Sequence, residues 1–322
     1  MTKISLEAVT IAKKALDSII AHNPLQFSTT FSKMADCSVF LKPECLQKNG
    51  SFKIRGAYYM FSQYTPADRK KGVVTFSAGN WAQGASYAGF LLGIPVTVIM
   101  PENANPKKAA ATRGYGGEVI LFGKNSNELY QKARELAQDK GAIFVNPLEN
   151  LDMIIGDGTV GLEILEEEPE IEVVVVPVGG GGLIAGIASA IKGKKPNVKI
   201  YGVQPEGASA MIRSLRAGKV VELDEVNTIA DGLAVKRPDE NTFHIIQNAV
   251  DDIVLVSDQE IKETIFLLLE RAKLLVEPAG AASLAGVVYH RIPNIKGKNI
   301  AIVLTGGNID FRLLTEIITS HL

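Results

Sequence analysis

The chain has few of the residues that build disulfide frameworks, metal centres or membrane spans. Its 322 residues include two cysteines, Cys37 and Cys45, whose spacing makes neither a metal motif nor a disulfide framework. No apolar stretch reaches the length of a transmembrane helix, and the N-terminus lacks the apolar core of a signal peptide. The formal net charge of -1 gives no electrostatic case for nucleic acid or an anionic membrane as a partner. We therefore expect a protein of the reducing cytoplasm that binds neither nucleic acid nor membrane.

Histidine is also scarce, and its positions exclude further classes of site. The four histidines, His22, His244, His290 and His321, all fall outside the loops that could bind a ligand. The spacing brings together no serine–histidine pair and no cluster of histidine, cysteine and acidic residues. The sequence therefore disfavours triad hydrolases and zinc hydrolases, and we expect no metal site.

What the chain does have is an alternation of buried strands and amphipathic helices. Hydrophobic residues make up 46% and charged residues 21%, enough to bury a full core. A first series predicts strands at residues 73–76, 96–99, 118–121 and 143–145, with helices at 81–92, 106–115 and 127–138 between them. A second series predicts strands at 173–176, 199–203, 253–256 and 299–304. Such alternation is typical of parallel sheets covered by helices, so we expect an α/β protein of two packed units. The smaller unit spans residues 72–149, and the larger one comprises residues 1–71 and 150–322.

Four consecutive glycines, Gly179-Gly180-Gly181-Gly182, follow the valine-rich strand and open a helix. Backbone N–H groups without side chains, together with a helix N-terminus, are suited to bind a phosphate. A tight turn for close packing is the plainer interpretation, but one or two glycines would suffice for it. The pattern Gly180-x-Gly182-x-x-Ala185, with Glu206 about 20 residues further on, also fits a dinucleotide-binding loop. A nicotinamide-dependent oxidoreductase therefore stands as a competing hypothesis.

One lysine, Lys53, stands between Phe52 and Ile54 in an apolar context. A lysine that loses solvation has a lowered pKa, and its neutral amine then serves as a nucleophile or a base. This is what a Schiff-base lysine requires. The alternative is a lysine at the start of a helix whose amine reaches solvent.

Three further loops follow strands and carry small or polar residues. Ser77-Ala78-Gly79-Asn80-Trp81 exposes N–H groups suited to a carboxylate, although Ser77 and Asn80 would equally serve as helix N-caps. Thr305 follows the last strand and could place a hydroxyl against a ligand. Glu277 precedes the small residues at 278–282 and could line the same crevice. Because ligands bind at the carboxyl ends of parallel strands, we expect these loops to meet.

These parts resemble pyridoxal-phosphate enzymes of the tryptophan-synthase-β-like fold (fold type II). Within that fold the chain is similar to the threonine/serine dehydratase and serine racemase group, and most like a short, catabolic-type threonine dehydratase. The resemblance spans residues 24–310 and rests on several motifs in the family's order, namely Lys42-Pro43-Glu44-Cys45-Leu46-Gln47, Ser51-Phe52-Lys53-Ile54-Arg55-Gly56-Ala57, Ser77-Ala78-Gly79-Asn80, Pro177-Val178 with the four glycines, Ala230-Asp231-Gly232 and Thr305-Gly306-Gly307-Asn308-Ile309-Asp310.

The resemblance implies a role for each of these residues. Lys53 would be the catalytic residue, forming the Schiff base with pyridoxal 5'-phosphate and later acting as the base beside Cα. The remaining cofactor contacts would come from Phe52, Asn80, Gly179, Gly180, Gly181, Gly182, Leu183, Gly232, Glu277 and Thr305. The substrate carboxylate would be held by Ser77, Ala78, Gly79, Asn80 and Trp81. The implied reaction is β-elimination of L-threonine, and secondly L-serine, to a 2-oxo acid and ammonia. The family also suggests a homodimer or homotetramer.

The chain departs from the group's pattern at six positions, one of which is Asn23 in place of a common threonine. Ala78 stands where the racemases have a second proton-carrying serine, so we expect elimination, with racemisation minor at most. Gln204 and Ala210 stand where the racemases have carboxylates that bind a divalent metal, so we expect no such site. Trp81 stands where the group usually has histidine, and we expect its large indole to change the shape of the pocket. Asp157 stands where glutamine is usual. The chain ends soon after the last strand, so we expect no C-terminal regulatory domain. A serine racemase-like enzyme, another β-hydroxy amino acid lyase and a non-catalytic phosphate-ligand-binding protein stay open as alternatives.

Overall fold

A computed structural model describes residues 4–147 and 149–321 of the chain. Its strands are β1 (Gln26–Phe27), β2 (Ser38–Pro43), β3 (Val73–Phe76), β4 (Val96–Met100), β5 (Glu118–Leu121), β6 (Ile143–Val145), β7 (Val173–Pro177), β8 (Lys199–Pro205), β9 (Asp252–Val256) and β10 (Asn299–Leu304). Its helices are α1 (Leu6–Leu16), α2 (Thr29–Ala35), α3 (Lys53–Ser62), α4 (Pro66–Lys71), α5 (Asn80–Leu92), α6 (Pro106–Gly114), α7 (Ser126–Lys140), α8 (Leu151–Asp157), α9 (Thr159–Glu167), α10 (Gly182–Lys194), α11 (Ala210–Ala217), α12 (Glu240–Ala249), α13 (Asp258–Leu267), α14 (Pro278–Val288) and α15 (Phe311–Thr319). Short turns of helix are η1 (Glu44–Leu46), η2 (Glu206–Ala208), η3 (Asp231–Leu233) and the π-helical η4 (Leu268–Ala272).

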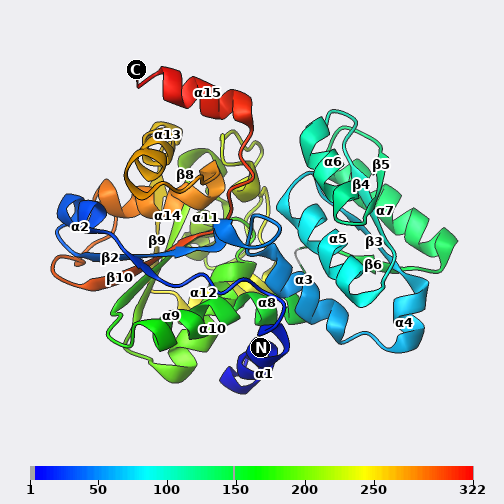
Figure 1. The fold of residues 1–322 in the computed structure, drawn as a ribbon, viewed down its shortest axis with the longest axis horizontal. Coiled ribbons are helices and arrows are strands. Elements are labelled where there is room, and N and C mark those ends of the chain that lie inside the picture. The colour runs from blue at the N-terminus through cyan, green and yellow to red at the C-terminus, as the bar shows by residue number, and fades with distance from the viewer. Residues whose placement is uncertain (1–3, 148, 322) are drawn as a thin grey trace.

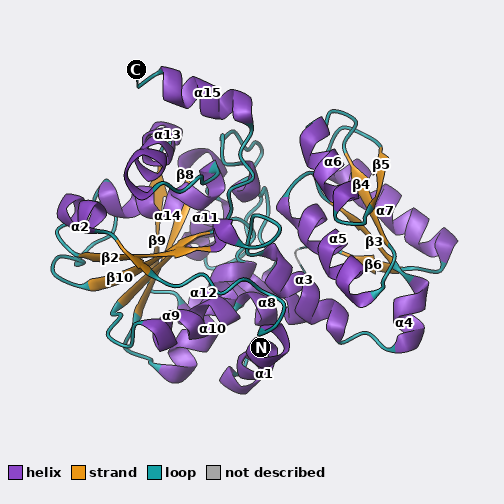
Figure 2. Cartoon of the chain, in the orientation of Figure 1, coloured by secondary structure: helices purple, strands orange, loops and turns teal. Residues whose placement is uncertain are grey.

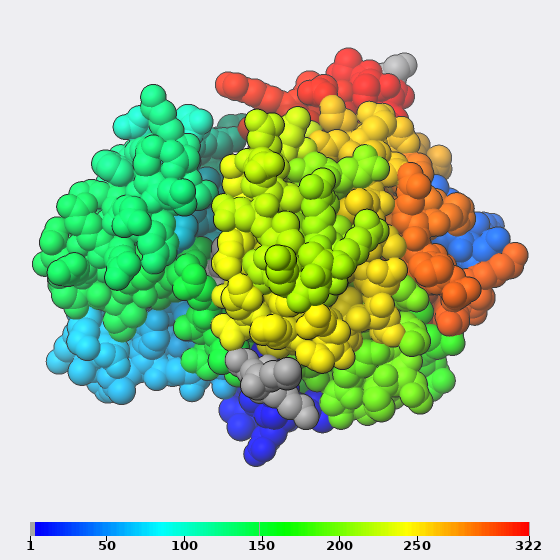
Figure 3. Space-filling model, turned by 180° about the vertical axis from the view of Figure 1, so that it is seen from behind, coloured from blue at the N-terminus to red at the C-terminus, as the bar shows by residue number. Residues whose placement is uncertain are grey.

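The strands form two separate sheets that lie in two lobes (Figures 1 and 2). The large sheet has the order β1-β2-β10-β7-β8-β9 and is parallel except for the antiparallel pair β1–β2. The small sheet has the order β5-β4-β3-β6 and is parallel throughout. Figure 3 shows the small lobe, in cyan and green, beside the yellow segments of the large lobe from behind. The expected α/β class with two sheets, one parallel and one mixed, is confirmed.

Alternating side chains of the central strands explain why helices cover both faces of the large sheet. In β7, Val173 and Val175 face the core that holds α2, α13 and α14, whereas Val174 and Val176 face the core that holds α9, α10 and α12. Because successive side chains of a strand point to opposite faces, a run of valines suits a strand that is buried on both sides. The strand β10 follows the same rule in its run from Ile300 to Leu304.

The small sheet is likewise covered on both faces. Residues of α3 and α5 pack on one face together with Val73 and Val96, and α7 covers the other face, where Val74 and Ile99 lie. The core of the small lobe therefore also draws on residues before position 72, through α3. Within the described part of the chain, no helix has both the length and the apolar character needed to cross a membrane.

The predicted strands and helices agree with those observed, apart from shifts of a few residues at their ends. The helix expected at residues 81–92 begins one residue earlier, at Asn80. The capping box of Ser257 and Glu260 that the sequence predicts at the start of α13 is present. The N-terminal strands β1 and β2 were not expected, and β2 pairs with β10, more than 250 positions along the chain.

Candidate active site

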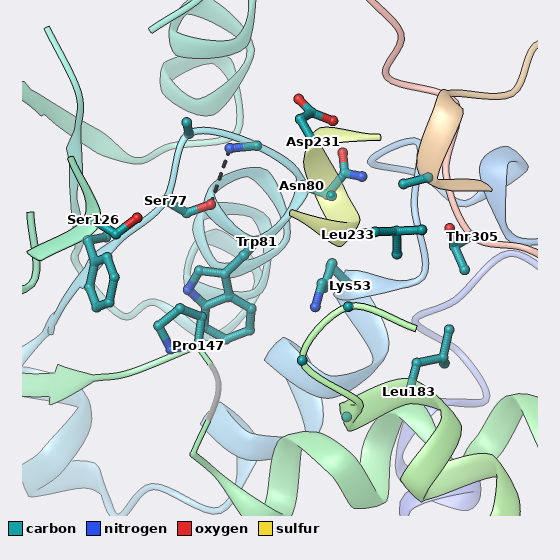
Figure 4. Close-up of a pocket in the computed structure, with 18 of the residues that line it drawn as sticks. Lys53, Ser77, Asn80, Trp81, Ser126, Pro147, Leu183, Asp231, Leu233 and Thr305 are labelled. Carbon is teal, nitrogen blue, oxygen red and sulfur yellow. Dashed lines mark hydrogen bonds between the residues drawn. The ribbon is translucent and has the colours of Figure 1, made fainter. Parts of the chain in front are cut away.

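A cavity of about 430 Å³ lies where loops of the two lobes meet. Its walls include Phe52, Lys53, Ser77, Ala78, Gly79, Asn80, Trp81, Gly179, Gly180, Gly181, Gly182, Leu183, Gly232, Glu277 and Thr305, which are all the site residues expected from the sequence. Most of them follow the carboxyl ends of β3, β7 and β10, as expected for parallel sheets. Figure 4 shows Lys53 near the middle, with Asn80 and Thr305 on one side and Ser77 and Trp81 on the other.

Lys53 is the first residue of α3 and projects into this cavity. Its Nζ atom lies 4.7 Å from the centre of the Phe52 ring, and no described residue accepts a hydrogen bond from it. Burial lowers the pKa of the Lys53 amine, while the nearby carboxyls of Asp157 and Glu277 act in the opposite direction. An amine with a lowered pKa and no hydrogen-bond partner is suited to act as a nucleophile or a base.

The four-glycine loop connects β7 to α10 and has a conformation that requires glycine at one position. Gly181 has φ +94°, and a Cβ atom there would lie 2.6 Å from Cδ1 of Ile246. Ala185 is the first residue of α10 whose N–H reaches back to the loop, donating to the Gly181 carbonyl at 2.9 Å. The N–H groups before it, that of Leu183 among them, have no acceptor within the helix. This end of the cavity is therefore a cradle for an anion.

Asn80 connects the two lobes through its side-chain amide. Its Nδ2 donates to Oε1 of Glu277 at 2.5 Å, and its Oδ1 accepts from Nδ2 of Asn308 at 2.8 Å. Burial and the nearby Asp231 carboxyl together raise the pKa of Glu277 to about 7, against the opposing effects of Lys108 and Asn80. The sequence predicted a ligand contact or a helix N-cap for Asn80, but here it also joins the lobe of α5 to that of β10.

The neighbouring residues of this loop form an apolar wall with few polar groups. Ser77 Oγ accepts from the N–H of Gly79 at 3.2 Å, shown as a dashed line in Figure 4. Trp81 is only 4% exposed, and its Nε1 donates to Oγ1 of Thr75 at 2.9 Å. The polar edge of the indole therefore bonds to β3, and the ring itself lines the cavity beside Pro147.

Thr305 supplies a hydroxyl at the far end of the cavity. Its side chain is almost wholly buried, and among the described residues none hydrogen-bonds to its hydroxyl. Its backbone carbonyl accepts from the N–H of Phe52 at 3.1 Å, so the residue also fixes the segment that carries Lys53. A buried hydroxyl without a protein partner indicates a position for a ligand atom.

The structure adds residues to the site that sequence reasoning did not assign to it. Lys108 of α6 forms an ion pair with Asp231 of η3, with 2.6 Å between Nζ and Oδ2, and both line the cavity. Asp231 was visible within the Ala230-Asp231-Gly232 motif, whereas nothing local distinguished Lys108. Glu206, expected to contact a ribose in a dinucleotide site, is exposed on η2 and does not line the cavity.

The site fits a phosphorylated aldehyde cofactor in three respects. A lysine of lowered pKa offers the amine that reacts with an aldehyde, the glycine loop offers the cradle for a phosphate, and Thr305 offers a hydroxyl in the same cavity. Within the described ranges, no group of three or more histidine, cysteine, aspartate or glutamate side chains could hold a metal ion.

Comparison with known proteins gives the same family. A family model described as pyridoxal-phosphate dependent enzyme matches residues 16–306. An L-threonine ammonia-lyase of Thermotoga maritima is 44% identical over 99% of this chain and 79% of its own length. The catabolic L-threonine dehydratase TdcB of Escherichia coli is 40% identical over 98% of this chain and 96% of its own. Among solved structures, maize serine racemase has a TM-score of 0.93 with 33% identity, covering 100% of both chains. Threonine deaminase isoform 2 of Solanum lycopersicum has a TM-score of 0.92 with 36% identity, covering 98% of this chain and 92% of its own. The chain thus belongs to the family of pyridoxal-phosphate dependent enzymes.

Proposed function

We propose that the protein is an L-threonine ammonia-lyase that removes the β-hydroxyl and the amine of L-threonine, and secondly of L-serine. The products are a 2-oxo acid and ammonia. The observation that carries the proposal is the meeting of the Lys53 amine and the four-glycine cradle in one cavity. Relatives that are named for this reaction and match nearly the whole chain support the choice of substrate.

In this proposal, different residues that line the cavity bind different parts of the cofactor. When bound, pyridoxal 5'-phosphate supplies an aldehyde for the substrate amine and accepts electrons from Cα. The N–H groups from Gly179 to Leu183 would hold its phosphate, and the hydroxyl of Thr305 would serve its ring nitrogen. Phe52, Asn80, Gly232 and Glu277 would contact the rest of the cofactor. A hydroxyl, unlike a carboxylate, gives the ring nitrogen little reason to stay protonated.

The chain's own residues bind the substrate and move its protons. The segment from Ser77 to Trp81 offers N–H groups and small side chains to the substrate carboxylate. Lys53 takes the α-proton once its amine is free, because burial lowers its pKa and leaves the nitrogen lone pair available.

Ala78 decides between elimination and racemisation. A racemase needs a second proton carrier on the opposite face of Cα, and an alanine methyl group carries no proton. The likeness to maize serine racemase therefore supports a common fold, while Ala78 favours elimination in this chain. Efficient conversion of L-serine to D-serine by the purified protein would contradict this part of the proposal.

The visible spectrum of the purified protein tests the proposal. We expect an absorption band that borohydride removes, together with a mass increase that peptide mapping places on Lys53. A panel of β-hydroxy amino acids, assayed by release of 2-oxo acid, then ranks the substrates, with L-threonine expected first. A colourless protein that binds no added pyridoxal phosphate would refute the assignment.

We also propose how the chain is organised and where it works. Residues 1–71 and 150–322 form the large cofactor-binding domain, and residues 72–149 form the small domain. The protein acts in the cytoplasm as a homodimer or homotetramer, which light scattering of the purified protein tests. A monomer at all concentrations would contradict the last statement.

A further inference from the structure

Helix α8 is fixed between the lysine helix and the glycine-loop helix by close backbone contacts. A Cβ atom on Gly156 would lie 2.7 Å from the carbonyl oxygen of Arg55 and 2.9 Å from Cα of Gly56, in α3. A Cβ atom on Gly158 would lie 2.8 Å from the carbonyl oxygen of Gly186, in α10. Asp157 stands between these two glycines. Its backbone is therefore held at a junction of the helix that begins with Lys53 and the helix that follows the phosphate cradle.

The carboxyl of Asp157 is enclosed and has a single hydrogen bond. The residue is 2% exposed and lines the cavity. Its Oδ1 accepts from the N–H of Gly56 at 3.1 Å, and no other described residue donates a hydrogen bond to this carboxyl. Gly56 lies one helical turn after Lys53. A buried carboxylate with one hydrogen bond is unfavourable unless a positive charge stands near it.

The charged groups around Asp157 leave Lys53 as its counterpart. Arg55 also faces it from α3, and Glu44 faces it from η1. Arg55 is bound to Glu44 and Glu163 through paired hydrogen bonds, and an arginine does not lose its proton in a protein. Lys53 is therefore the cation near Asp157 whose charge can change.

Lys53 and Asp157 shift each other's pKa in the directions expected for a pair of opposite charges. Burial raises the pKa of Asp157 to about 7, while Lys53, the N–H of Gly56 and Arg55 lower it and Glu44 raises it. Burial lowers the pKa of Lys53, while Asp157 and Glu277 raise it. Each group thus stabilises the charged form of the other, against the same desolvation.

We propose that Asp157 is a positioning residue for Lys53, whose carboxylate stabilises positive charge on the Lys53 nitrogen and so sets the pH at which that nitrogen loses its proton. The inference rests on the function proposed above. A neutral side chain at this position would keep the hydrogen bond to Gly56 without supplying the charge. The protonation of the lysine nitrogen in this chain is then controlled from the end of α8, where Asp157 lines the cavity.

Asp157→Asn tests the proposal because it preserves the shape and the Oδ1 acceptor and removes only the charge. The measurement is a pH titration of the visible absorption band of the holoprotein, with the pH profile of kcat/KM beside it. We expect both midpoints to fall by about one to three pH units, the shift that an opposite charge at close range produces. Asp152→Asn is the matched control, since Asp152 lies on the same helix but does not line the cavity, and we expect unchanged midpoints.

The titration of the Asp157 variants has several other possible outcomes. If Asp157→Asn does not fold, Asp157→Gln repeats the titration with another neutral side chain. Midpoints that stay in place in a variant that binds the cofactor overturn the proposal, and so does loss of cofactor binding in both neutral variants. If the wild-type protein neither binds pyridoxal phosphate nor turns over threonine, the proposed function itself fails. If the wild-type protein is coloured and active but the titration midpoints of the variants do not shift, only the role of Asp157 is refuted.

Discussion

The buried ion cluster around Arg55 predicts a large loss of stability when this one side chain is replaced. Arg55 is 0% exposed and uses all five of its N–H groups. Nε and Nη2 donate to Glu44, Nη1 and Nη2 donate to Glu163, and Nη1 also donates to Thr159, at 2.5 to 3.0 Å. Lys42, also 0% exposed, completes the cluster with its Nζ 3.0 Å from Oε2 of Glu163.

Replacing Arg55 with methionine leaves two buried carboxylates short of a counter-charge. Among the described residues, the carboxylate of Glu44 then keeps one long hydrogen bond, from Gln47 at 3.4 Å, whereas Glu163 keeps Lys42. Removing one partner of a buried ion pair costs about 3–5 kcal/mol, because the other charge stays buried and unpaired. We therefore expect Arg55→Met to lower the free energy of unfolding by about that amount. Arg55→Lys also loses stability, since a lysine cannot bind two carboxylates in the paired geometry.

Urea unfolding at a fixed concentration of cofactor measures the effect, with transition midpoints compared between variants. The double variant Arg55→Met with Glu44→Met is the control, because it removes the unpaired charge together with its partner and should recover much of the loss. An Arg55→Met variant destabilised by less than about 1 kcal/mol, as for an exposed pair, would refute this account of the cluster.

Three further predictions concern the acid stability, the phosphate cradle and the stereochemistry. Burial raises the pKa of Glu163, but Arg55 and Lys42 lower it to about 2. Ionised Glu163 therefore contributes about 3 kcal/mol to the free energy of unfolding above pH 4.5, and this contribution is lost as the pH falls through 2. Glu163→Gln should flatten this acid dependence of the urea midpoint. Gly181→Ala should lose cofactor affinity by equilibrium dialysis, since the left-handed backbone costs about 1–2 kcal/mol and overpacking about 1–3 kcal/mol more. Gly182→Ala should lose less cofactor affinity, because the nearest atom to its added Cβ would be Cγ1 of Ile154 at 3.8 Å. Ala78→Ser should raise L-to-D serine conversion by about 10²-fold, measured by chiral chromatography; no gain would contradict the assigned role of that face.

The parts of the fold that the sequence predicts are those specified by local patterns. The strands of the small sheet are short apolar runs separated by amphipathic helices, and each can be recognised without knowledge of its partner. The strand β2 could not be recognised in this way. It ends in Lys42 and Pro43, and it becomes a strand by pairing with β10 at the other end of the chain. Lys42 is buried there only because α9 brings Glu163 and Glu167 to it.

The site residues also fall into two groups, those that a local pattern identifies and those that only the packing of the fold brings to the cavity. Lys53, the glycine loop and Thr305 follow strands or motifs that identify them locally, and all of them line the cavity. Lys108 lies on a polar helix with no such signal, and it enters the site because α6 meets η3 across the lobes. Asp157 was visible only as a departure from a family pattern. Its place beneath Lys53 depends on the packing of three helices, which no local pattern reports.

Asn80 shows why a correct residue can still have an incomplete role. Its position at the start of α5, after β3, indicated a ligand contact or an N-cap, and its N-cap is in fact Gly79. Both ends of its amide instead bond to residues of the large lobe, Glu277 and Asn308. Because these bonds join the loop that follows β3 in one lobe to residues beside α14 and β10 in the other, a relative movement of the two lobes must strain or break them.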